Sequence, residues 1–372
     1  MLIGVLKEIK NNEFRVGLVP GSVRELVANG HQVIVQHNAG LGIGFDDAAF
    51  SKAGAMIVET AEEIFQRAEL IVKVKEPQKE ECHMLRENQM LFTYLHLAPD
   101  PEQARLLQQS GCIAIAYETV TNKHGGLPLL APMSEVAGRM AIQAGATSLE
   151  KTHGGSGVLL GGVPGVAPAK VVVLGGGMVG TNSVRMAVGM GAQVVVMDKS
   201  IERLYQLDMR FGSSITTIYS TVDAIEQQVT SADLIIGAVL VPGGSAPKLV
   251  KRDMLSAMRS GSVMVDVSID QGGCFETSRP TTHQKPTYIV EGIVHYCVSN
   301  MPGAVPRTST FALNNATLPF VLELANEGYQ QAMRHDPHLL NGLNVCQGKI
   351  THQAVASALQ QEYVPAEMMV RK

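Results

Sequence analysis

Three glycines, Gly175, Gly177 and Gly180, have the spacing of a G-x-G-x-x-G motif and follow a run of β-branched residues at 170–174. A helix-like stretch, a second apolar run and Asp198 come next, with Asp198 roughly 20 positions after the last glycine. In such a unit the first glycine permits a sharp turn, the second lets the backbone approach a pyrophosphate, and the third lets the helix pack on its strand. The helix N-terminus offers N–H groups to the phosphates, and the carboxylate holds the ribose hydroxyls. The motif predicts dinucleotide binding, since a plain glycine-rich turn would not account for Asp198.

Two lysines and a histidine lie near the ends of further predicted strands. Lys73 and Lys75 belong to a predicted strand at 70–75, and their even spacing would place both ammonium groups on one face. The alternative is that they simply reach solvent at the end of the strand. His96 lies near the carboxyl end of a predicted strand at 90–97, and a histidine can take and return a proton near neutral pH. The alternative for His96 is a hydrogen-bonded histidine in the core.

A loop arginine and a strand-end carboxylate complete the candidates. Arg15 follows the first predicted strand, and a guanidinium suits the bidentate binding of a carboxylate, although most loop arginines are simply solvated. Asp270 follows the predicted strand at 262–267 and precedes glycines, which would expose its carboxylate at the carboxyl edge of a sheet. Asp266 lies inside that strand, where a structural hydrogen-bond acceptor is favoured. An enzyme that uses a nicotinamide needs such acid/base groups, and cations for an anionic substrate.

The composition of the 372-residue chain limits the classes of function. With 45% hydrophobic and 17% charged residues, 37 glycines and no tryptophan, it is typical of an α/β protein with many turns, and it is long enough for two domains. The net charge of −4 argues against nucleic acid as a partner. The five scattered cysteines predict reduced thiols in a cytoplasmic protein. Neither a signal peptide nor a membrane-spanning segment is expected.

No metal site is expected from the spacing of the histidine, cysteine and carboxylate residues. Glu323 and Glu327 are four positions apart on a predicted helix and could share a cation, but solvated carboxylates are favoured. The chain has no G-x-S-x-G motif, and no P-loop lysine follows the glycine motif.

Alternating strand-like and helix-like segments predict an α/β fold of two doubly wound, Rossmann-like domains separated by a cleft. In the first third of the chain the predicted strands are 2–6, 32–36, 70–75, 90–97 and 112–117. After a glycine-rich segment at 154–165, expected to be a mobile connection, six parallel strands are predicted at 170–174, 193–197, 215–219, 233–239, 262–267 and 288–291. Long helices are predicted at 132–151 and 308–327. The C-terminal segment would pack back on the first domain, giving a discontinuous domain of residues 1–130 and 304–372 and a dinucleotide-binding domain of residues 131–303.

Several collinear segments resemble the family of alanine dehydrogenases and transhydrogenase NAD-binding subunits. They are IGVLKE at 3–8, EFRVG at 13–17, VKEP at 74–77, TYLHL at 93–97, PMSEVAG at 132–138, GGGMVG at 175–180 and NMPG at 300–303, and they extend over essentially the whole chain. The resemblance implies a substrate domain formed from both chain ends, a central NAD domain and a homohexamer. The implied reaction is the reversible oxidative deamination of L-alanine to pyruvate and ammonium, with NAD as the hydride acceptor.

The resemblance also implies roles for single residues. Arg15 and Lys75 would bind the substrate carboxylate and carbonyl, and His96 and Asp270 would be the acid/base pair, with the division of roles between them open. The residues that would line the NAD site are Ser134, Gly175, Gly177, Met178, Val179, Gly180, Asp198, Arg203, Ser220, Val239, Leu240, Val267, Ser268, Ile269, Asp270, Arg279, Val298, Ser299, Asn300 and Met301. Some relatives bind a metal through an acidic residue and a histidine on the long C-terminal helix; here Glu327 takes the second position, so no metal is implied.

Two alternatives stay open. The first is a non-enzymatic NAD(H)-binding subunit of a transhydrogenase-like complex, which would need the glycine motif but not Arg15, Lys75 and His96 together; their joint presence favours an enzyme. The second is a dehydrogenase of another small amino acid, such as serine or glycine, or one that acts on glyoxylate in the reverse direction. The expected partners are L-alanine, pyruvate and ammonium, with neither nucleic acid nor a membrane, and the expected location is the cytoplasm.

Overall fold

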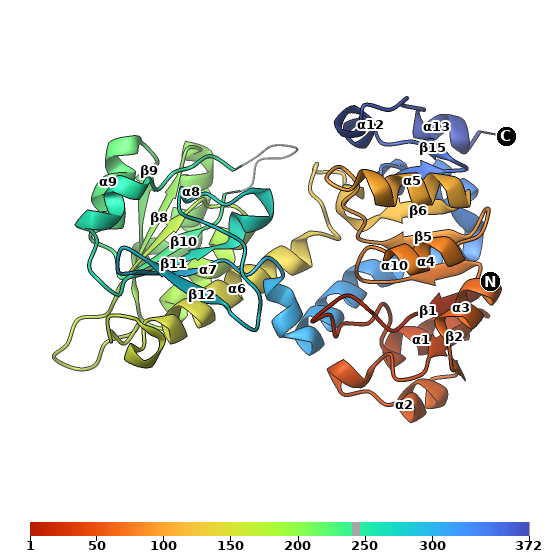
Figure 1. Cartoon of the computed structure of the whole chain (residues 1–372), viewed down its shortest axis with the longest axis horizontal. Coiled ribbons are helices and arrows are strands. Elements are labelled where there is room, and N and C mark those ends of the chain that lie inside the picture. Colours follow the sequence, from red (N-terminus) through yellow and green to blue (C-terminus); the bar gives the residue numbers. More distant parts are fainter. Residues whose placement is uncertain (240–245, 372) are drawn as a thin grey trace. The chain divides into compact units, whose positions relative to one another are not determined.

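The computed structural model describes residues 1–239 and 246–371, which form two compact units. Unit 1 consists of Met1–Met133 and Val305–Lys372, so it takes in both ends of the chain, and unit 2 consists of Ser134–Ala304. Each unit is built around its own sheet, with helices packed on it (Figure 1). Both sheets are predominantly parallel, so the predicted class of two doubly wound, Rossmann-like α/β domains is confirmed.

The sheet of unit 1 draws strands from both ends of the chain. Its strands are β1 (Leu2–Val5), β2 (Gln32–Gln36), β3 (Met56–Val58), β4 (Leu70–Val72), β5 (Met90–Thr93), β6 (Ile113–Ala116), β14 (Leu343–Cys346) and β15 (Lys349–Ile350). Their order is β15-β14-β6-β5-β4-β1-β2-β3. The strands β1 to β6 are parallel, whereas β14 runs antiparallel to β6 and β15 antiparallel to β14. The short strands β3, β14 and β15 are not among those predicted.

Nine helices of the described residues belong to unit 1. They are α1 (Pro20–Ala28), α2 (Asp47–Lys52), α3 (Ala61–Arg67), α4 (Lys79–Met84), α5 (Pro101–Ser110), α10 (Pro306–His335), α11 (Pro337–Leu340), α12 (Gln353–Leu359) and α13 (Ala366–Met369). Pro20 occupies the first turn of α1, a position that needs no N–H donor. The side chain of Thr60 accepts a hydrogen bond from the N–H of Glu63 and so caps the start of α3.

The long helix α10 is regular up to the predicted boundary. Gly328 has φ 72° and ψ 159°, which is not helical, so the first helical stretch ends near Glu327 and a second one continues to His335. Asn314 ties α10 to the N-terminal part of unit 1. Its Oδ1 accepts a hydrogen bond from the N–H of Val19 at 2.8 Å, and its Nδ2 donates to the carbonyl of Gly17 at 3.0 Å.

Unit 2 has the strand order of a nucleotide-binding fold. Its strands are β7 (Lys170–Leu174), β8 (Gln193–Asp198), β9 (Ile215–Tyr219), β10 (Leu234–Gly237), β11 (Val263–Asp266), β12 (Thr287–Val290) and β13 (Ile293–Tyr296). Its helices are α6 (Ala131–Ser148), which starts in unit 1, α7 (Met178–Gly189), α8 (Ile201–Phe211) and α9 (Val222–Thr230). The sheet order is β12-β13-β11-β10-β7-β8-β9, so the direction of winding reverses between β7 and β10, where such sheets bind their ligands.

The sixth parallel strand of unit 2 is not the one predicted. The segment predicted at 288–291 forms β12, but β12 is an antiparallel edge strand paired with β13. The sixth parallel strand is β13, which lies next to β11. Glu291 and Gly292 join β12 to β13 with φ values of 50° and 80°, as in a two-residue hairpin turn. The prediction failed because Glu-Gly is not among the dipeptides that signal such a turn most strongly.

The glycine-rich segment at 154–165 has a defined backbone structure, although its composition predicts an irregular, mobile connection. The N–H of Ser156 donates to the carbonyl of Gly261 at 2.9 Å, and the N–H of Gly157 donates to the carbonyl of Leu149 at 2.8 Å. A short antiparallel bridge follows. These bonds attach the segment to Leu149, just after the end of α6, and to the connection before β11.

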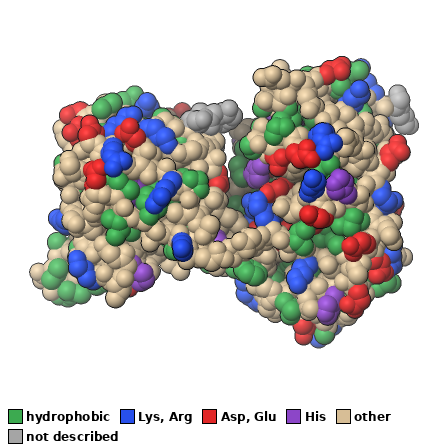
Figure 2. Space-filling model, in the orientation of Figure 1, with side chains coloured by type: hydrophobic (Ala, Val, Ile, Leu, Met, Phe, Trp, Pro, Cys, Tyr) green, Lys and Arg blue, Asp and Glu red, His purple; other side chains and the backbone are tan. Residues whose placement is uncertain are grey.

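Charged side chains of both signs are interspersed over the face shown in Figure 2. This distribution agrees with the nearly balanced 30 basic and 34 acidic residues of the chain. Within the part of the chain that the structure describes, no helix is long and apolar enough to cross a membrane.

Candidate functional site

Most of the predicted cofactor-binding residues lie at one edge of the unit 2 sheet. The strands β7, β8, β9, β10, β11 and β13 run in the same direction, so the residues that end or follow them meet at the carboxyl edge. These residues are Gly175, Gly177, Met178, Val179, Gly180, Asp198, Ser220, Val239, Val267, Ser268, Ile269, Asp270, Val298, Ser299, Asn300 and Met301. The topology therefore assembles one edge from segments that are far apart in the sequence.

The other four predicted cofactor residues do not end or follow one of these parallel strands, or lie outside the described residues. Ser134 lies in α6 and Arg203 in α8. Arg279 precedes β12, and its guanidinium carbon lies 4.3 Å from the centre of the Tyr288 ring, a cation–π contact. Leu240 lies outside the described residues. Of the three that are described, Arg203 contacts the glycine motif directly.

The three motif glycines have the conformations that their spacing predicts. Gly175 has a φ of 100°, which favours glycine and turns the chain sharply after β7. A Cβ atom added at Gly180 would lie 1.8 Å from the carbonyl oxygen of Gly175, so only glycine lets α7 pack this closely. A Cβ atom added at Gly177 would meet no atom of the described residues within 4 Å, so Gly177 faces open space at the start of α7. This space and the N-terminal N–H groups of α7 fit the pyrophosphate of a dinucleotide.

The middle glycine of the turn, Gly176, is held from two sides by residues predicted to bind the cofactor. Oδ2 of Asp198 accepts a hydrogen bond from the N–H of Gly176 at 2.7 Å, and Oδ1 accepts one from the N–H of Ser200 at 2.8 Å. Nε of Arg203 donates to the carbonyl of Gly176 at 2.5 Å, and Nη2 donates to Oγ1 of Thr181 at 2.6 Å. Asp198 and Arg203 therefore shape the glycine turn itself, a role that the motif spacing did not reveal.

Replacing Gly176 with alanine should weaken the binding of a dinucleotide such as NADH about tenfold, the usual size of an overpacking penalty. The new Cβ atom would lie 2.7 Å from Cδ1 of Leu207 and 3.2 Å from Oδ2 of Asp198, so the turn must shift. A fluorescence titration with NADH measures the effect. Gly189→Ala is the control, because a Cβ atom there meets no described atom within 4 Å. Gly176→Ala/Leu207→Ala should recover part of the loss, whereas an unchanged Kd in Gly176→Ala would contradict the steric argument.

Unit 1 places its candidate residues after three neighbouring parallel strands. Arg15 follows β1, Lys75 follows β4 and His96 follows β5, and these strands lie in the order β5-β4-β1. The carboxyl ends of parallel neighbours meet at one edge. The ring of Tyr94 stacks on that of His96 with centroids 5.7 Å apart. Two cations and a histidine are thus gathered at the carboxyl edge of this sheet.

Arg15 is buried, with 3% of its surface exposed, so it is not a solvated loop arginine. Its Nε and Nη2 donate to the two carboxylate oxygens of Glu13 at 2.7 and 2.6 Å, and its Nη1 donates to Sδ of Met133 at 3.0 Å. Burial would raise the pKa of Glu13, but the hydrogen bonds and charge of Arg15 outweigh this and lower it. Glu13 occupies the Nε–Nη2 edge of the guanidinium, and the binding of a substrate carboxylate by Arg15 stays a prediction.

The prediction that Lys73 and Lys75 share one face of a strand is wrong. The strand β4 ends at Val72, so neither lysine lies within it. Lys73 is fully buried, and its Nζ lies 3.1 Å from Oε2 of Glu8 and 2.7 Å from Oε1 of Glu81. The alternative of a lysine that reaches solvent is therefore also wrong for Lys73, whose ammonium is committed to two carboxylates.

Lys75 differs from Lys73 because its ammonium has no such partners. Its side chain is partly buried, and no hydrogen bond or ion pair among the described residues engages its Nζ. Burial lowers the pKa of Lys75; the charge of Glu76 opposes this shift and that of Arg15 adds to it. A partly dry ammonium beside a buried guanidinium is suited to bind an anion.

His96 is positioned by Glu118 rather than by a strand. The strand β5 ends at Thr93, short of the predicted 97, and His96 has a left-handed φ of 50°. Oε1 of Glu118 accepts hydrogen bonds from the N–H of His96 at 2.6 Å and from that of Leu95 at 3.2 Å. The side chain of His96 is 46% exposed, so the alternative of a core histidine is wrong. Its ring is accessible to a substrate.

The carboxylate that ends β11, Asp266, and the one that follows it, Asp270, have the separate placements that the sequence predicts. Asp266 is buried and accepts hydrogen bonds from the N–H groups of Ser268 at 3.0 Å and Cys274 at 2.9 Å, and from the hydroxyl of Ser278. Burial raises the pKa of Asp266, and these hydrogen bonds oppose the shift. It is a structural acceptor. Asp270 is exposed in the single 3-10 turn that follows, at the carboxyl edge of the sheet.

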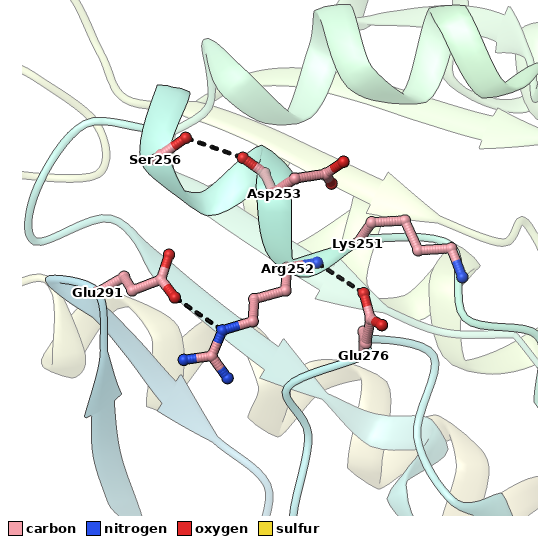
Figure 3. A pocket seen from close by; sticks show the side chains of 6 residues that line it. All are labelled: Lys251, Arg252, Asp253, Ser256, Glu276 and Glu291. Carbon is pink, nitrogen blue, oxygen red and sulfur yellow. Dashed lines mark hydrogen bonds and ion pairs between the residues drawn. The ribbon is translucent and has the colours of Figure 1, made fainter.

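A cavity of about 730 Å³ in unit 2 is lined by residues other than the predicted ones (Figure 3). Its lining residues are Lys251, Arg252, Asp253, Ser256, Glu276 and Glu291. Nε of Arg252 donates to Oε1 of Glu291 at 2.8 Å, and its backbone N–H donates to Glu276 at 2.8 Å. Because the central arginine is already paired, we assign this cavity no role.

Glu323 and Glu327 lie in α10. Among the described residues, no group of three or more histidine, cysteine or carboxylate side chains is arranged to hold a metal ion. Oε2 of Glu327 lies 2.8 Å from Nδ1 of His335. Burial raises the pKa of Glu323, and the charges of Asp336 and Glu327 add to the shift.

The glycine turn and the strand order of unit 2 are those of a dinucleotide-binding protein, and the two cations and the histidine of unit 1 are residue types that a dehydrogenase needs. The family models agree. The model "Alanine dehydrogenase/PNT, N-terminal domain" matches residues 4–137, and the model "Alanine dehydrogenase/PNT, C-terminal domain" matches residues 141–353. The chain belongs to the alanine dehydrogenase/PNT family, as its motifs predict.

Individual relatives match over nearly the full chain. The alanine dehydrogenase of Halomonas elongata is 61% identical over 370 residues, which cover 100% of both chains, and that of Bacillus subtilis is 54% identical over 368 residues, 99% of this chain and 97% of the relative. A solved L-alanine dehydrogenase superposes with a TM-score of 0.94 at 54% identity, covering 97% of this chain and 99% of that one. A transhydrogenase from Sinorhizobium meliloti has a TM-score of 0.82 at 23% identity, covering 95% of this chain and 100% of that one, and shares the fold.

Proposed function

We propose that this chain is an NAD-dependent alanine dehydrogenase, an oxidoreductase that catalyses the reversible oxidative deamination of L-alanine to pyruvate and ammonium. The observation that carries this proposal is the 61% identity with the alanine dehydrogenase of Halomonas elongata over the full length of both chains. The glycine turn of unit 2 and the joint presence of Arg15, Lys75 and His96 in unit 1 support it. In this proposal, unit 1 is the substrate domain and unit 2 the NAD-binding domain.

The proposal is tested by supplying the purified protein with L-alanine and NAD alone. NADH absorbance should appear at a rate proportional to protein concentration. If NAD binds but no NADH forms, the alternative of a non-enzymatic nucleotide-binding subunit replaces the proposal. The same assay with serine, glycine and, in the reverse direction, glyoxylate distinguishes alanine from the other small substrates.

The residues at the carboxyl edge of unit 2 would bind NAD, which accepts a hydride from Cα of alanine when bound. The N–H groups at the start of α7 bind the pyrophosphate in the space that Gly177 leaves open. Each carboxylate oxygen of Asp198 accepts one hydrogen bond from the backbone and can accept another, so Asp198 can also hold the ribose hydroxyls.

In unit 1, Arg15 binds the substrate carboxylate, and Lys75 binds the carboxylate and later the carbonyl of pyruvate. Both contacts are charge-assisted hydrogen bonds in partly dry surroundings, where they are stronger than in water. They hold Cα in one orientation, and orientation supplies much of the rate of a reaction between two bound partners.

His96 and Asp270 are the proposed acid/base pair. Loss of the hydride from Cα would leave an iminium carbon. One of the two residues would remove a proton from the water that attacks this carbon, and the other would assist the proton transfers that release ammonium and leave pyruvate. The side chain of His96 is 46% exposed and Asp270 is an exposed residue, so both can be reached by water. The division of the two roles stays open.

The enzyme should prefer NAD to NADP by about 100-fold in kcat/KM, since an unfavourable like-charge contact costs several kcal/mol. The carboxylate of Asp198 would repel a 2′-phosphate. Arg203 is not oriented to neutralise it, because Nε, Nη1 and Nη2 of Arg203 all donate to acceptors within the protein. Steady-state kinetics with both cofactors measure the ratio, and equal values would contradict the role of Asp198.

We further propose a homohexamer in the cytoplasm, on the basis of the family resemblance. All five cysteines are free and buried, which agrees with a reducing compartment. Light scattering on the purified protein should give the mass of six 39.8 kDa chains.

A further inference from the structure

The backbone that carries Lys75 is held by side chains from other elements. The N–H of Val74 donates to Oε1 of Glu8 at 2.7 Å, and the N–H of Lys75 donates to the same oxygen at 3.3 Å. The carbonyl of Lys75 accepts a hydrogen bond from Oγ1 of Thr93 at 2.9 Å. Both backbone polar groups of Lys75 are therefore fixed by side chains after the regular strand has ended.

Glu8 also belongs to a buried ion triad. Its second oxygen, Oε2, lies 3.1 Å from Nζ of Lys73, and Oε1 of Glu81 lies 2.7 Å from the same Nζ. All three side chains are at most 2% exposed. The hydroxyl of Tyr117 donates to the carbonyl of Lys73 at 2.9 Å, which fixes the backbone on this side as well. Burying three charged groups contributes little net stability to a fold. The triad is better explained by its effect on the position of the backbone at residues 73–75.

We propose that Glu8 is a positioning residue for Lys75. One carboxylate oxygen binds the ammonium of Lys73 and the other binds the N–H groups of Val74 and Lys75, so Glu8 fixes the direction in which the Lys75 side chain leaves the backbone. The inference rests on the proposed role of Lys75 in binding the substrate. An ammonium on a flexible four-carbon stem depends on its backbone for direction, and no bond among the described residues holds Nζ of Lys75 itself.

Glu8→Gln and Glu81→Gln are matched variants for this proposal. Each carboxylate binds Nζ of Lys73 through one oxygen and backbone N–H groups through the other. Glu8 binds the N–H groups of Val74 and Lys75, whereas Oε2 of Glu81 accepts a hydrogen bond from the N–H of Gln78 at 2.8 Å. An amide has one acceptor oxygen and one donor nitrogen, so a glutamine cannot serve both partners. Both variants remove one buried charge beside Lys73 and should lower Tm, but only Glu8→Gln disturbs the backbone of Lys75.

The measurement is the Kd of pyruvate for the complex of the full-length enzyme with NADH. We expect Glu8→Gln to raise this Kd about tenfold and Glu81→Gln to raise it less than about twofold, with the Kd of NADH unchanged in both. In a Lys75→Ala background, Glu8→Gln should change the pyruvate Kd less than about twofold, because the side chain that it positions is gone. Thr93→Val removes the hydroxyl that binds the Lys75 carbonyl and should also raise the Kd, so the test remains available if Glu8→Gln does not fold.

Three results would overturn the proposal. Equal losses in the two glutamine variants would mean that Glu8 acts through general stability. A full effect of Glu8→Gln in the Lys75→Ala background would mean that Glu8 acts without Lys75. An unchanged pyruvate Kd in Glu8→Gln and Thr93→Val would mean that the backbone contacts do not direct the side chain. An unchanged pyruvate Kd in Lys75→Ala alone would instead refute the substrate role of Lys75, a failure of the proposed function that this single variant identifies.

Discussion

Replacing Lys75 with alanine should lower kcat/KM for pyruvate by about 10²- to 10³-fold, the size seen when a charge-stabilising donor is lost from a dry site. The ammonium of Lys75 is partly buried and has no ion-pair partner among the described residues, so its loss leaves no internal charge unpaired. Tm and the Kd of NADH should therefore barely change. Steady-state kinetics, an NADH titration and a thermal melt measure the three quantities.

Lys75→Arg is the control for shape. A guanidinium is planar and presents its donors in a fork, so it cannot replace a compact ammonium beside the buried Arg15, and we expect no rescue. Retention of most activity in Lys75→Ala would show that the substrate carboxylate is bound elsewhere.

The lowered pKa of Lys75 adds a pH signature to the same prediction. Burial is the main cause, because it disfavours the charged form. Lys75 is charged below its pKa, so pyruvate binding should be complete at lower pH and should be lost as the pH rises through that lowered pKa. The loss should begin at a lower pH than the ordinary pKa of a lysine would give, and it is measured as the pH profile of the pyruvate Kd.

His96→Ala and Asp270→Asn should each lower turnover by at least about 10²-fold, the usual effect of losing an acid/base group. We expect the double variant to be little worse than the poorer single variant, because residues that act as one unit are strongly non-additive. NADH should still bind to His96→Ala, since His96 lies in unit 1. It should bind more weakly to Asp270→Asn, since Asp270 lies at the carboxyl edge of unit 2.

The kinetics of the four proteins distinguish the possible outcomes. If the two losses multiply in the double variant, His96 and Asp270 act in separate steps. Near-normal turnover in His96→Ala would remove His96 from the acid/base pair, and the mechanism would then depend on Asp270 and Lys75.

The sequence was sufficient to predict the features that depend on residues close together along the chain. The turn at Gly175 and the close approach at Gly180 follow from the motif, because positive φ and missing Cβ atoms are local requirements. The alternation of strands and helices indicated the fold class. Because the strands of such a sheet are parallel, residues that end or follow them, such as Asp198 and Asp270, lie at one carboxyl edge. For the same reason Arg15, Lys75 and His96 could be selected as strand-end candidates.

Only the tertiary structure decided what each of these side chains contacts. Lys73 and Lys75 look equivalent in the sequence, yet the ammonium of Lys73 is bound to Glu8, 65 positions away, whereas no bond among the described residues engages the ammonium of Lys75. The sequence also did not predict that β12 is antiparallel, or that Asp198 and Arg203 both bind the backbone of Gly176. Periodicity reports which face of an element is apolar, but burial, pairing and pKa shifts arise from segments that meet only after folding, because hydrogen bonds and Coulomb interactions act over distances in space and not along the chain.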